Sequence, residues 1–196
     1  MEHSSHEVVT DDGVRISLDC YREPGRASAL IICPGFFQSK DTLTFQRLAS
    51  ALAGLCDVIC LDFRGHGRSS SLYSFSALEE ADLSAAVRWA TKRYSRIAIL
   101  GFSLGAATAI TFTSQHHHVK TLIAVSAPAR FEEIEFEFWT PTAIRTGLRG
   151  LETGSGCRPG NLWKSKRPPI EAIRDVSPVP VLFRSEEHTS ELQSQR

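Results

Sequence analysis

The stretch of the chain best suited to chemistry is residues 101–105, which read Gly-Phe-Ser-Leu-Gly. An apolar run at residues 96–100 precedes it, and a run rich in small residues at 106–112 follows it. This order predicts a strand, a sharp turn that carries Ser103, and a helix. Glycines on both sides of the turn remove the Cβ atoms that would clash where strand and helix converge. Because a strained turn would present the hydroxyl group, Ser103 is the candidate nucleophile.

The helix expected after Ser103 supplies a second feature. The backbone N–H of Leu104 would lie at its N-terminus, where unpaired amides and the helix dipole favour a developing negative charge. Gly101, Phe102 and Gly105 would hold the turn in shape. The alternative is a glycine-lined turn with an incidental serine. The flanking elements disfavour it, because a nucleophilic serine of this kind requires both the strand before the turn and the helix after it. One turn would thus provide a nucleophile and half of an oxyanion hole.

Length and composition restrict the class of protein. The chain has 196 residues, 42% of them hydrophobic, which suits one domain or slightly more with a substantial core. Its 22 basic and 22 acidic residues cancel, so we expect a small molecule as partner, and neither nucleic acid nor an anionic membrane. No apolar run approaches the length of a membrane span, and the first residues do not resemble a secretion signal.

The cysteines and histidines give no sign of a metal, a cofactor or a disulfide. The cysteines are Cys20, Cys33, Cys56, Cys60 and Cys157. They include no CxxC pair and lie mostly in apolar runs, which predicts buried thiols in a reducing, cytoplasmic compartment. Residues 116–118 are three consecutive histidines, which would point in different directions from a helix end. We expect a solvated helix end there rather than a metal site.

Hydrophobic patterning predicts strands that alternate with helices. Strands are expected at residues 7–10 and 14–21, around a turn, and buried strands at 29–33, 56–63, 96–102, 119–125 and 179–183. Helices are expected at 43–55, after Ser103, and at 76–93, where Ser76 and Glu79 would form a capping box. The pattern predicts an α/β fold, a doubly wound and mostly parallel sheet with helices on both faces. The site of such a sheet lies at the carboxyl ends of its strands.

One segment interrupts this alternation. Residues 129–170 carry alternating acids and aromatics and then a stretch rich in Gly, Arg and Pro, which predicts a small cap-like or lid-like insertion over the site. The rest of the chain would form a core at residues 1–128, a return to the core at 171–183 and a tail at 184–196.

With two further motifs, the serine turn makes the chain resemble the α/β-hydrolase fold superfamily over most of its length. The first is Cys-Pro-Gly-Phe-Phe-Gln-Ser-Lys at residues 33–40, after a predicted strand. The family has there a loop that gives the second oxyanion amide, which the resemblance assigns to the N–H of Phe36. Gly35 would support it, and Phe37 is the next candidate. Pro34 stands where the family usually has histidine.

The other motif is Asp-Phe-Arg-Gly-His-Gly-Arg-Ser at residues 62–69. By residue type alone, His66 could be a general base, since it lies in a glycine-rich loop at a strand end. The resemblance implies instead that this loop supports the site. Asp62 and Arg64 would be a pair that fixes the loop, and His66 would be structural.

The superfamily's triad runs Ser, acid, His along the chain, which implies an acid just after residues 179–183 and a histidine beyond one more strand. Neither is found there. Glu186 and His188 follow, but they are two residues apart and would share a face without either being positioned against the serine. A relocated acid after the preceding strand, Glu132 or Glu133, is the alternative.

The end of the chain has a separate explanation. Residues 184–194 read Arg-Ser-Glu-Glu-His-Thr-Ser-Glu-Leu-Gln-Ser, which is one reading frame of a sequencing-library adapter. We expect this tail to be non-native. The last strand and helix of the fold, with the triad acid and base, would then be missing from the printed chain.

The expected function is that of a serine hydrolase acting on a carboxylic ester or related acyl substrate through an acyl-enzyme, without cofactor or metal. Thioesterase, lipase-like and peptidase-like versions share the same serine turn and stay open. The printed chain would be nearly inactive because it lacks an identifiable acid and base. A non-catalytic binding protein of the same fold is the alternative.

Overall fold

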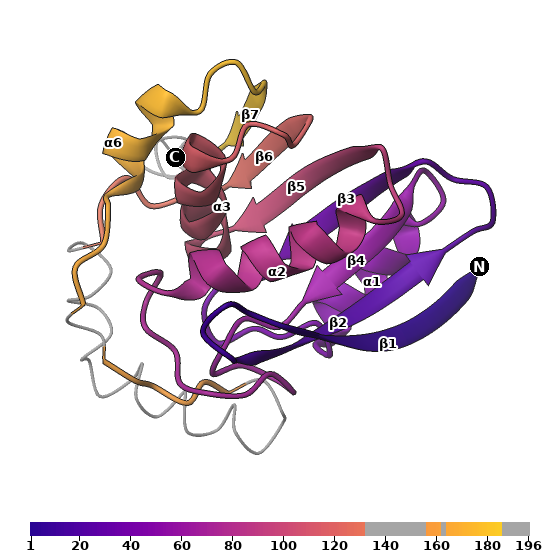
Figure 1. Ribbon diagram of the computed structural model, residues 1–196, viewed down its shortest axis with the longest axis horizontal. Helices are drawn as coiled ribbons and strands as arrows, with labels where there is room; N and C mark the ends of the chain where they lie inside the picture. Colours follow the sequence, from indigo (N-terminus) through magenta and orange to yellow (C-terminus); the bar gives the residue numbers. More distant parts are fainter. Residues whose placement is uncertain (132–155, 162–163, 186–196) are drawn as a thin grey trace, which may run out of the picture.

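The computed structural model describes residues 1–131, 156–161 and 164–185. Its centre is a seven-stranded sheet in the order β1-β2-β4-β3-β5-β6-β7 (Figure 1). The strands are β1 (Glu2–Val9), β2 (Arg15–Arg22), β3 (Ser28–Cys33), β4 (Asp57–Leu61), β5 (Arg96–Phe102), β6 (Thr121–Val125) and β7 (Val181–Arg184). β1 and β4 pair with β2 antiparallel, and all other neighbours are parallel. The predicted mostly parallel sheet is confirmed.

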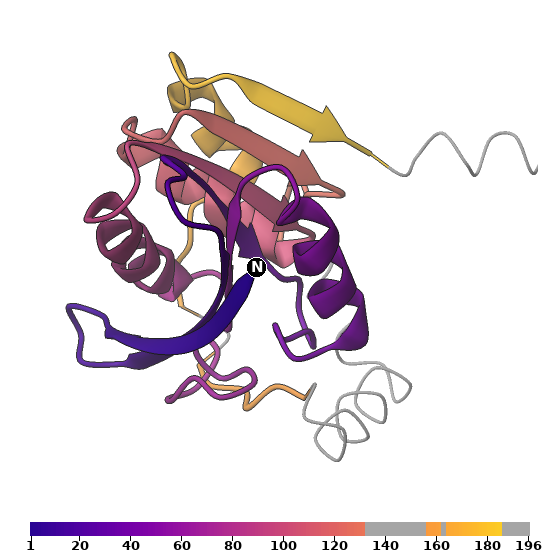
Figure 2. The same cartoon turned by 90° about the vertical axis from the view of Figure 1, so that its right-hand side faces the viewer.

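Helices cover both faces of this sheet (Figure 2). They are α1 (Leu43–Leu52), α2 (Glu79–Thr91), α3 (Leu104–Gln115) and the short α6 (Pro169–Ala172), which continues into the 3-10 helix η1 (Ile173–Asp175). α1 packs on one face, and α2, α3 and α6 pack on the other. This is the doubly wound arrangement that the alternation of elements predicts. In the described ranges, no helix has the length and apolar character needed to cross a membrane.

Each face of the sheet has its own hydrophobic core because side chains alternate along a strand. Beneath α2 and α3, Ile31 of β3 and Ile99 of β5 are register partners without exposed surface. On the opposite side of the sheet, Phe45 and Ala49 of α1 pack in a second cluster, in which Ile32 of β3 is fully buried. Burial on both faces explains why the parallel strands read as continuous apolar runs.

The predicted start of the first strand is wrong. β1 begins at Glu2 rather than at residue 7, and it pairs with β2 as far as Arg22. Its first half is polar but is held by side chains as well as by the backbone ladder, since the Ser5 hydroxyl donates to Asp19 Oδ1 at 2.7 Å. Apolar alternation therefore missed half of this edge strand.

The last strand is also shifted. β7 runs from Val181 to Arg184 rather than over residues 179–183. Pro180 has no N–H for a ladder and stands just before the strand. Arg184, which the sequence assigns to the tail, is instead the strand partner of Val125.

The predicted capping box at α2 is wrong. The helix begins at Glu79, and Ser76, with a φ of 71°, hydrogen-bonds to Thr108 Oγ1 at 3.0 Å. The Glu79 carboxylate accepts the N–H of Ser74 at 2.7 Å, and Ser74 Oγ accepts the N–H of Leu78 at 2.9 Å. Ser74, five residues before Glu79, therefore forms the kind of reciprocal hydrogen bonds that a capping box forms between two residues three positions apart.

A buried arginine connects three separate parts of the fold. Arg64, after β4, is 1% exposed, and its Nε donates to Asp82 Oδ1 of α2 at 2.9 Å. Its Nη1 donates to Asp12 Oδ2, in the turn between β1 and β2, at 2.7 Å. The hydrogen bonds from Arg64 lower the pKa of Asp12 to about 2, whereas burial raises the pKa of Asp82. Arg64 thus joins the β1–β2 turn, the loop after β4 and α2.

Replacing Arg64 should reveal this junction as a loss of stability. Arg64→Met leaves the buried Asp82 carboxylate without its cation, so the free energy of unfolding should fall by about 3–5 kcal/mol. Asp12→Asn removes a more exposed partner and should cost about 1 kcal/mol. Urea unfolding at pH 7 followed by circular dichroism measures both losses.

The matched control uses the same turn. Arg88 of α2 pairs with Asp11 at 3.0 Å, and both side chains are exposed. Arg88→Met should therefore change the free energy of unfolding by about 0.5 kcal/mol or less. Equal losses for Arg64→Met and Arg88→Met would contradict the assigned role.

Candidate active site

Ser103 occupies the sharp turn between β5 and α3 that the sequence predicts. Its φ of 48° and ψ of −120° lie in a region that L residues rarely adopt, at a cost of about 1–3 kcal/mol. Three backbone hydrogen bonds hold it there. Its N–H donates to the carbonyl of Val125 at 2.9 Å, and its carbonyl accepts the N–H groups of Ala106 and Ala107 at 2.9 and 3.1 Å. The side chain is half-buried.

The two glycines of the turn are required by contact. A Cβ at Gly101 would lie 2.5 Å from Cα of Ala106, so β5 and α3 could not converge with a larger residue there. A Cβ at Gly105 would overlap the carbonyl oxygens of Cys33 and Pro34. The first turn of α3 is therefore pressed against the end of β3 and the loop that follows it.

That loop, residues 34–40, passes beside the serine. A Cβ at Gly35 would lie 3.3 Å from Cβ of Ser103. The loop closes on itself, because the N–H of Gly35 donates to Gln38 Oε1 and the N–H of Gln38 donates to the carbonyl of Gly35, each at 3.2 Å. Phe37 has a φ of 59°, which is strained for a residue with a side chain. The predicted donor segment and the predicted nucleophile are thus neighbours.

Aromatic side chains line this side of the turn. The half-buried rings of Phe36 and Phe37 have centroids 3.9 Å apart, and Phe36 also lies 5.1 Å from Tyr73. Both phenylalanines pack on a buried cluster that includes Leu104 and Ala107 of α3. The surroundings of the serine are therefore apolar on this side.

Asp62 fixes two loops at once. It has no exposed surface, and its Oδ1 accepts the N–H of Lys40 at 2.7 Å while its Oδ2 accepts the N–H of Arg68 at 3.0 Å. The cation close to it is Lys40, with Nζ 3.8 Å from Oδ2. The predicted pair of Asp62 and Arg64 is therefore wrong, because Arg64 is held by Asp82. Both residues fix the loop after β4, each through another partner.

His66 is enclosed by this loop and by aromatic rings. It is 2% exposed, its Nδ1 lies 3.2 Å from the carbonyl oxygen of Arg64, and its ring centroid lies 4.6 Å from that of Tyr73. Its Nε2 has no hydrogen-bond partner among the described residues. Burial lowers the pKa of His66 to about 4. A general base with a pKa so far below neutrality would be poorly matched to its task, so this environment favours the supporting role.

Part of the predicted insertion lies against the same loop. The N–H of Arg158 donates to the carbonyl of Gly65 at 2.8 Å, and the N–H of Tyr73 donates to the carbonyl of Arg158 at 2.9 Å. The Arg158 guanidinium also donates to the carbonyl of Ser69. Residues 156–161 therefore join the loop after β4 in a tight backbone contact.

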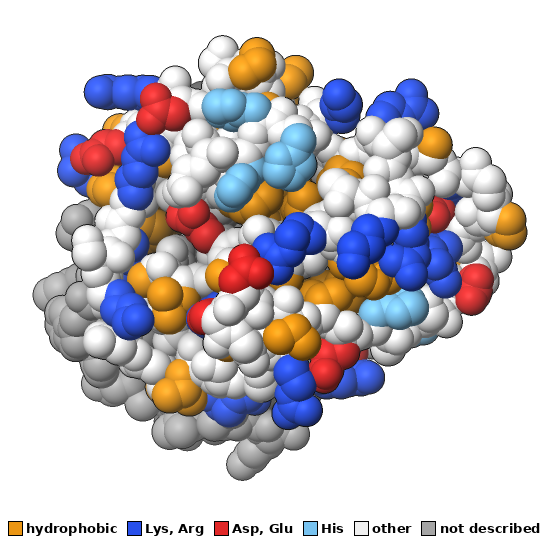
Figure 3. Space-filling view, in the orientation of Figure 1, with side chains coloured by type: hydrophobic (Ala, Val, Ile, Leu, Met, Phe, Trp, Pro, Cys, Tyr) orange, Lys and Arg blue, Asp and Glu red, His pale blue; other side chains and the backbone are white. Residues whose placement is uncertain are grey.

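The remaining candidates fall into two groups. Glu132, Glu133, Glu186 and His188 lie outside the described residues. The three histidines at 116–118 follow α3, where Figure 3 shows histidine side chains gathered on the surface. His117 Nε2 contacts the carbonyl oxygen of Asp175 at 2.8 Å. Within the described ranges no group of His, Cys, Asp or Glu side chains could hold a metal ion.

Two buried charges at the site have no assigned role in the sequence analysis. Lys40 ends the loop after β3, and Asp82 occupies a buried position of α2. Asp82 lies three residues after Glu79 and four before Ala86, on the face that a helix turns toward the core. A charge at an apolar position of this pattern predicts a buried ion pair, so Asp82 could have been found. Lys40 carries no comparable signal.

His66 should make stability depend on pH. In the unfolded chain a histidine titrates near 6.5, whereas in the fold His66 stays neutral down to about 4. Between these values only the unfolded state gains the proton, so stability falls as the pH falls, by up to about 1.4 kcal/mol per pH unit. Urea unfolding at pH 7 and pH 5 measures this loss. His66→Asn should reduce the difference between the two pH values, and an unchanged difference would contradict the assignment.

Known proteins share both the sequence pattern and the fold. The family model described as alpha/beta hydrolase fold matches residues 28–143, which is more than half of the chain. No curated protein sequence matches it. Among solved structures, an esterase of Pyrococcus furiosus is 20% identical, with a TM-score of 0.72 over 99% of this chain and 76% of that chain.

Two further structures extend the comparison. The alpha/beta hydrolase GrgF of Penicillium sp. sh18 is 18% identical, with a TM-score of 0.75 over 93% of this chain and 79% of that chain. Brefeldin A esterase, a bacterial homologue of human hormone sensitive lipase, is 20% identical, with a TM-score of 0.57 over 90% of this chain and 51% of that chain. At these identities the likeness concerns the fold alone. The sequence match, which spans the serine turn and both loops beside it, is what shows that this chain belongs to the α/β-hydrolase fold family.

Proposed function

We propose that this protein is a serine hydrolase that acts on a carboxylic ester or a related acyl compound. The observation that carries the proposal is the strained backbone of Ser103, held at a φ of 48° with the Gly35 backbone against its side chain. Membership of the α/β-hydrolase fold family supports hydrolysis of a small molecule. Two of the similar structures are esterases, which favours an ester among the acyl substrates.

In the proposed reaction, Ser103 Oγ attacks the carbonyl carbon of the substrate and passes its proton to a general base. The N–H groups of Leu104 and Phe36 donate to the oxyanion that forms. The tetrahedral intermediate collapses, the leaving group takes the proton from the base, and an acyl-enzyme remains. Water, deprotonated by the same base, then attacks the acyl carbon, and the base returns that proton to Ser103 Oγ as the acid is released.

We infer that the triad acid and base belong to chain that would follow β7 in the natural protein. Among the described residues, no histidine hydrogen-bonds to the Ser103 hydroxyl, and His66 is held by its own loop. β7 ends the sheet of the described residues, and its Leu182 and Phe183 side chains are 60% and 54% exposed. Large apolar side chains on an edge strand are typical of a surface that another element covers.

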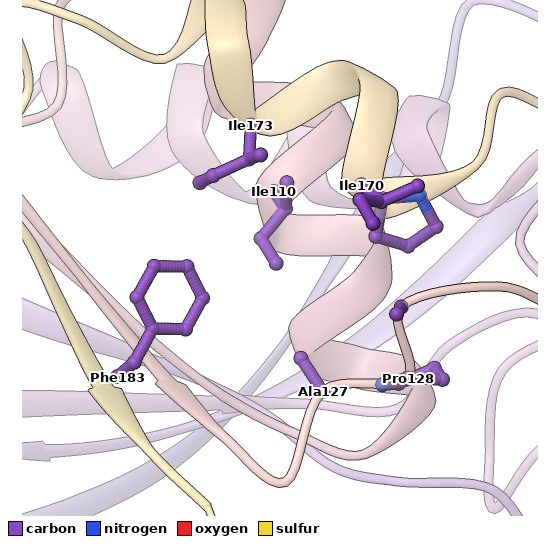
Figure 4. Close-up of a pocket in the computed structure, with 8 residues that line it drawn as sticks. Ile110, Ala127, Pro128, Ile170, Ile173 and Phe183 are labelled. Atoms are coloured by element: carbon purple, nitrogen blue, oxygen red, sulfur yellow. The ribbon is translucent and has the colours of Figure 1, made fainter.

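An apolar hollow beside β7 supports the same inference. It has a volume of about 190 Å³ and lies between α3, the segment after β6, α6, η1 and β7 (Figure 4). Ile110, Ile173 and Phe183 border it from three of these elements. A helix that followed β7 could fill this hollow. We propose accordingly that residues 184–196 are non-native, although Arg184 occupies a ladder position that any residue except proline can fill.

The substrate proposal rests on the residues beside the serine. Phe36 and Phe37 place two half-buried rings there, which favours an apolar acyl group. Residues 129–170 are proposed as the cap that completes the acyl site, since residues 156–161 within them already contact the loop after β4. A non-catalytic binding protein is the second candidate, favoured by the lack of a histidine on Ser103 among the described residues.

The printed chain should react only slowly at Ser103. Without a base, hydrolysis of p-nitrophenyl esters should stay near the residual level of roughly 10³–10⁴ over water that triad-deleted enzymes retain. Labelling by a fluorophosphonate, followed by intact-mass spectrometry, should be slow and absent in Ser103→Ala. Rapid stoichiometric labelling would show that the printed chain holds a working base and would refute its incompleteness.

The natural gene provides the complementary test. Sequencing its 3′ end should reveal an aspartate soon after Phe183 and a histidine some tens of residues later, and the protein made from it should label rapidly at Ser103. Genomic codons for residues 184–194 would contradict a non-native tail. A natural gene without such an acid and histidine would favour the binding protein.

A further inference from the structure

A fully buried lysine ends the loop that passes beside Ser103. The Lys40 side chain has no exposed surface, and its Nζ lies 3.1 Å from Asp41 Oδ1, 3.3 Å from Asp19 Oδ2 and 3.8 Å from Asp62 Oδ2. These carboxylates come from β2, from the loop after β3 and from the end of β4. Asp41 is the next residue after Lys40, so one ammonium group joins its own loop to two segments that are distant in the sequence, at Asp19 and Asp62.

The other cations near these carboxylates are more exposed than Lys40. Asp19 is 4% exposed and lies 3.5 Å from His3 Nε2, while Asp41 pairs with Arg68 at 3.1 Å. His3 and Arg68 are both at least half exposed, so Lys40 is the better placed cation for the buried carboxylate of Asp19. Charges removed from water persist only when they are paired and hydrogen-bonded. An apolar side chain could fill this space but could not hold three carboxylates at one point.

Lys40 is also tied down through its backbone. Its N–H donates to Asp62 Oδ1 at 2.7 Å, so backbone and side chain grip the same carboxylate. The other end of the loop is held where Gly105 packs on the carbonyls of Cys33 and Pro34. Between these two anchors lie the Phe36 amide and the strained Phe37, and strain of this kind persists only where the surroundings enforce it.

We propose that Lys40 is a positioning residue for the oxyanion-binding loop, which it holds beside Ser103 by binding Asp62, just after β4, and Asp19 of β2. Its relevance to catalysis rests on the proposed role of Ser103. The anchoring of the loop itself does not, so the two can be tested separately.

Amide hydrogen exchange measured by NMR on the printed chain tests the anchoring. Lys40→Met should speed exchange at residues 35–41 by at least tenfold and leave residues 29–33 of β3 within twofold of the wild type. Asp19→Asn removes one carboxylate and keeps the cation, so it should fold even if Lys40→Met does not, with a smaller acceleration at the same amides. Unchanged exchange at residues 35–41 in the folded variants would overturn the proposal.

A matched variant separates anchoring from general destabilisation. Asp57, at the opposite end of β4, is 2% exposed and accepts the Tyr94 hydroxyl at 2.8 Å and the N–H of Glu23 at 3.0 Å. Asp57→Asn should lower the unfolding temperature and leave residues 35–41 as protected, relative to β3, as in the wild type. Equal acceleration of the loop by Asp57→Asn and by Lys40→Met would overturn the proposal.

Fluorophosphonate labelling with imidazole as an external base tests the link to Ser103. Lys40→Met should lower the labelling rate at saturating reagent about tenfold. Asp19→Asn, used in its place if Lys40→Met does not fold, should lower this rate severalfold. The apparent affinity for the reagent should stay unchanged in both variants. Asp57→Asn should label like the wild type. Wild-type labelling that does not depend on Ser103 would refute the hydrolase, while the exchange measurement would still decide the anchoring. Equal saturated rates in all variants would overturn the positioning role.

Discussion

The close contact between α3 and the end of β3 is the constraint on which the rest of this site depends. Gly105 has no Cβ, so the first turn of α3 can rest on the carbonyls of Cys33 and Pro34. That contact leaves no room for a relaxed turn, and Ser103 takes up a φ of 48°. It also brings the Gly35 loop to the serine. The absence of a side chain at Gly105 thus shapes both the Ser103 turn and its closeness to the loop after β3.

Buried charges hold the loops around this contact. Arg64 binds the β1–β2 turn to α2, and Lys40 binds the loop after β3 to β2 and to Asp62. Such pairs add little net stability over apolar packing, because each ion loses its hydration. They do restrict geometry, because a buried charge tolerates few arrangements of its partners. Loops at the carboxyl ends of parallel strands have no ladder of their own, so these ion pairs supply the order that hydrogen-bonded strands supply elsewhere.

Local patterns predicted the elements well where one physical period dominated. The central parallel strands β3, β4 and β5 and the strand–turn–helix around Ser103 appear where their apolar runs and glycines place them. Errors arose where polar side chains decide the boundary. Ser74, and not Ser76, pairs with Glu79 at the start of α2, and the polar residues from Glu2 onward form strand because β2 offers a complete partner. Neither boundary can be predicted from hydrophobic residues that repeat every two or every 3.6 positions.

The amino-acid sequence by itself determined the doubly wound sheet, the serine turn and the loops expected beside it, because strand and helix periods and glycine stereochemistry act over a few neighbouring residues. Only the tertiary structure decided which charges meet. Asp62 lies two residues from Arg64 yet is gripped by Lys40, while Arg64 reaches Asp12 and Asp82. Pairs of this kind depend on where loops from different strands converge, and that convergence is set by the packing of the whole sheet and not by spacing along the chain.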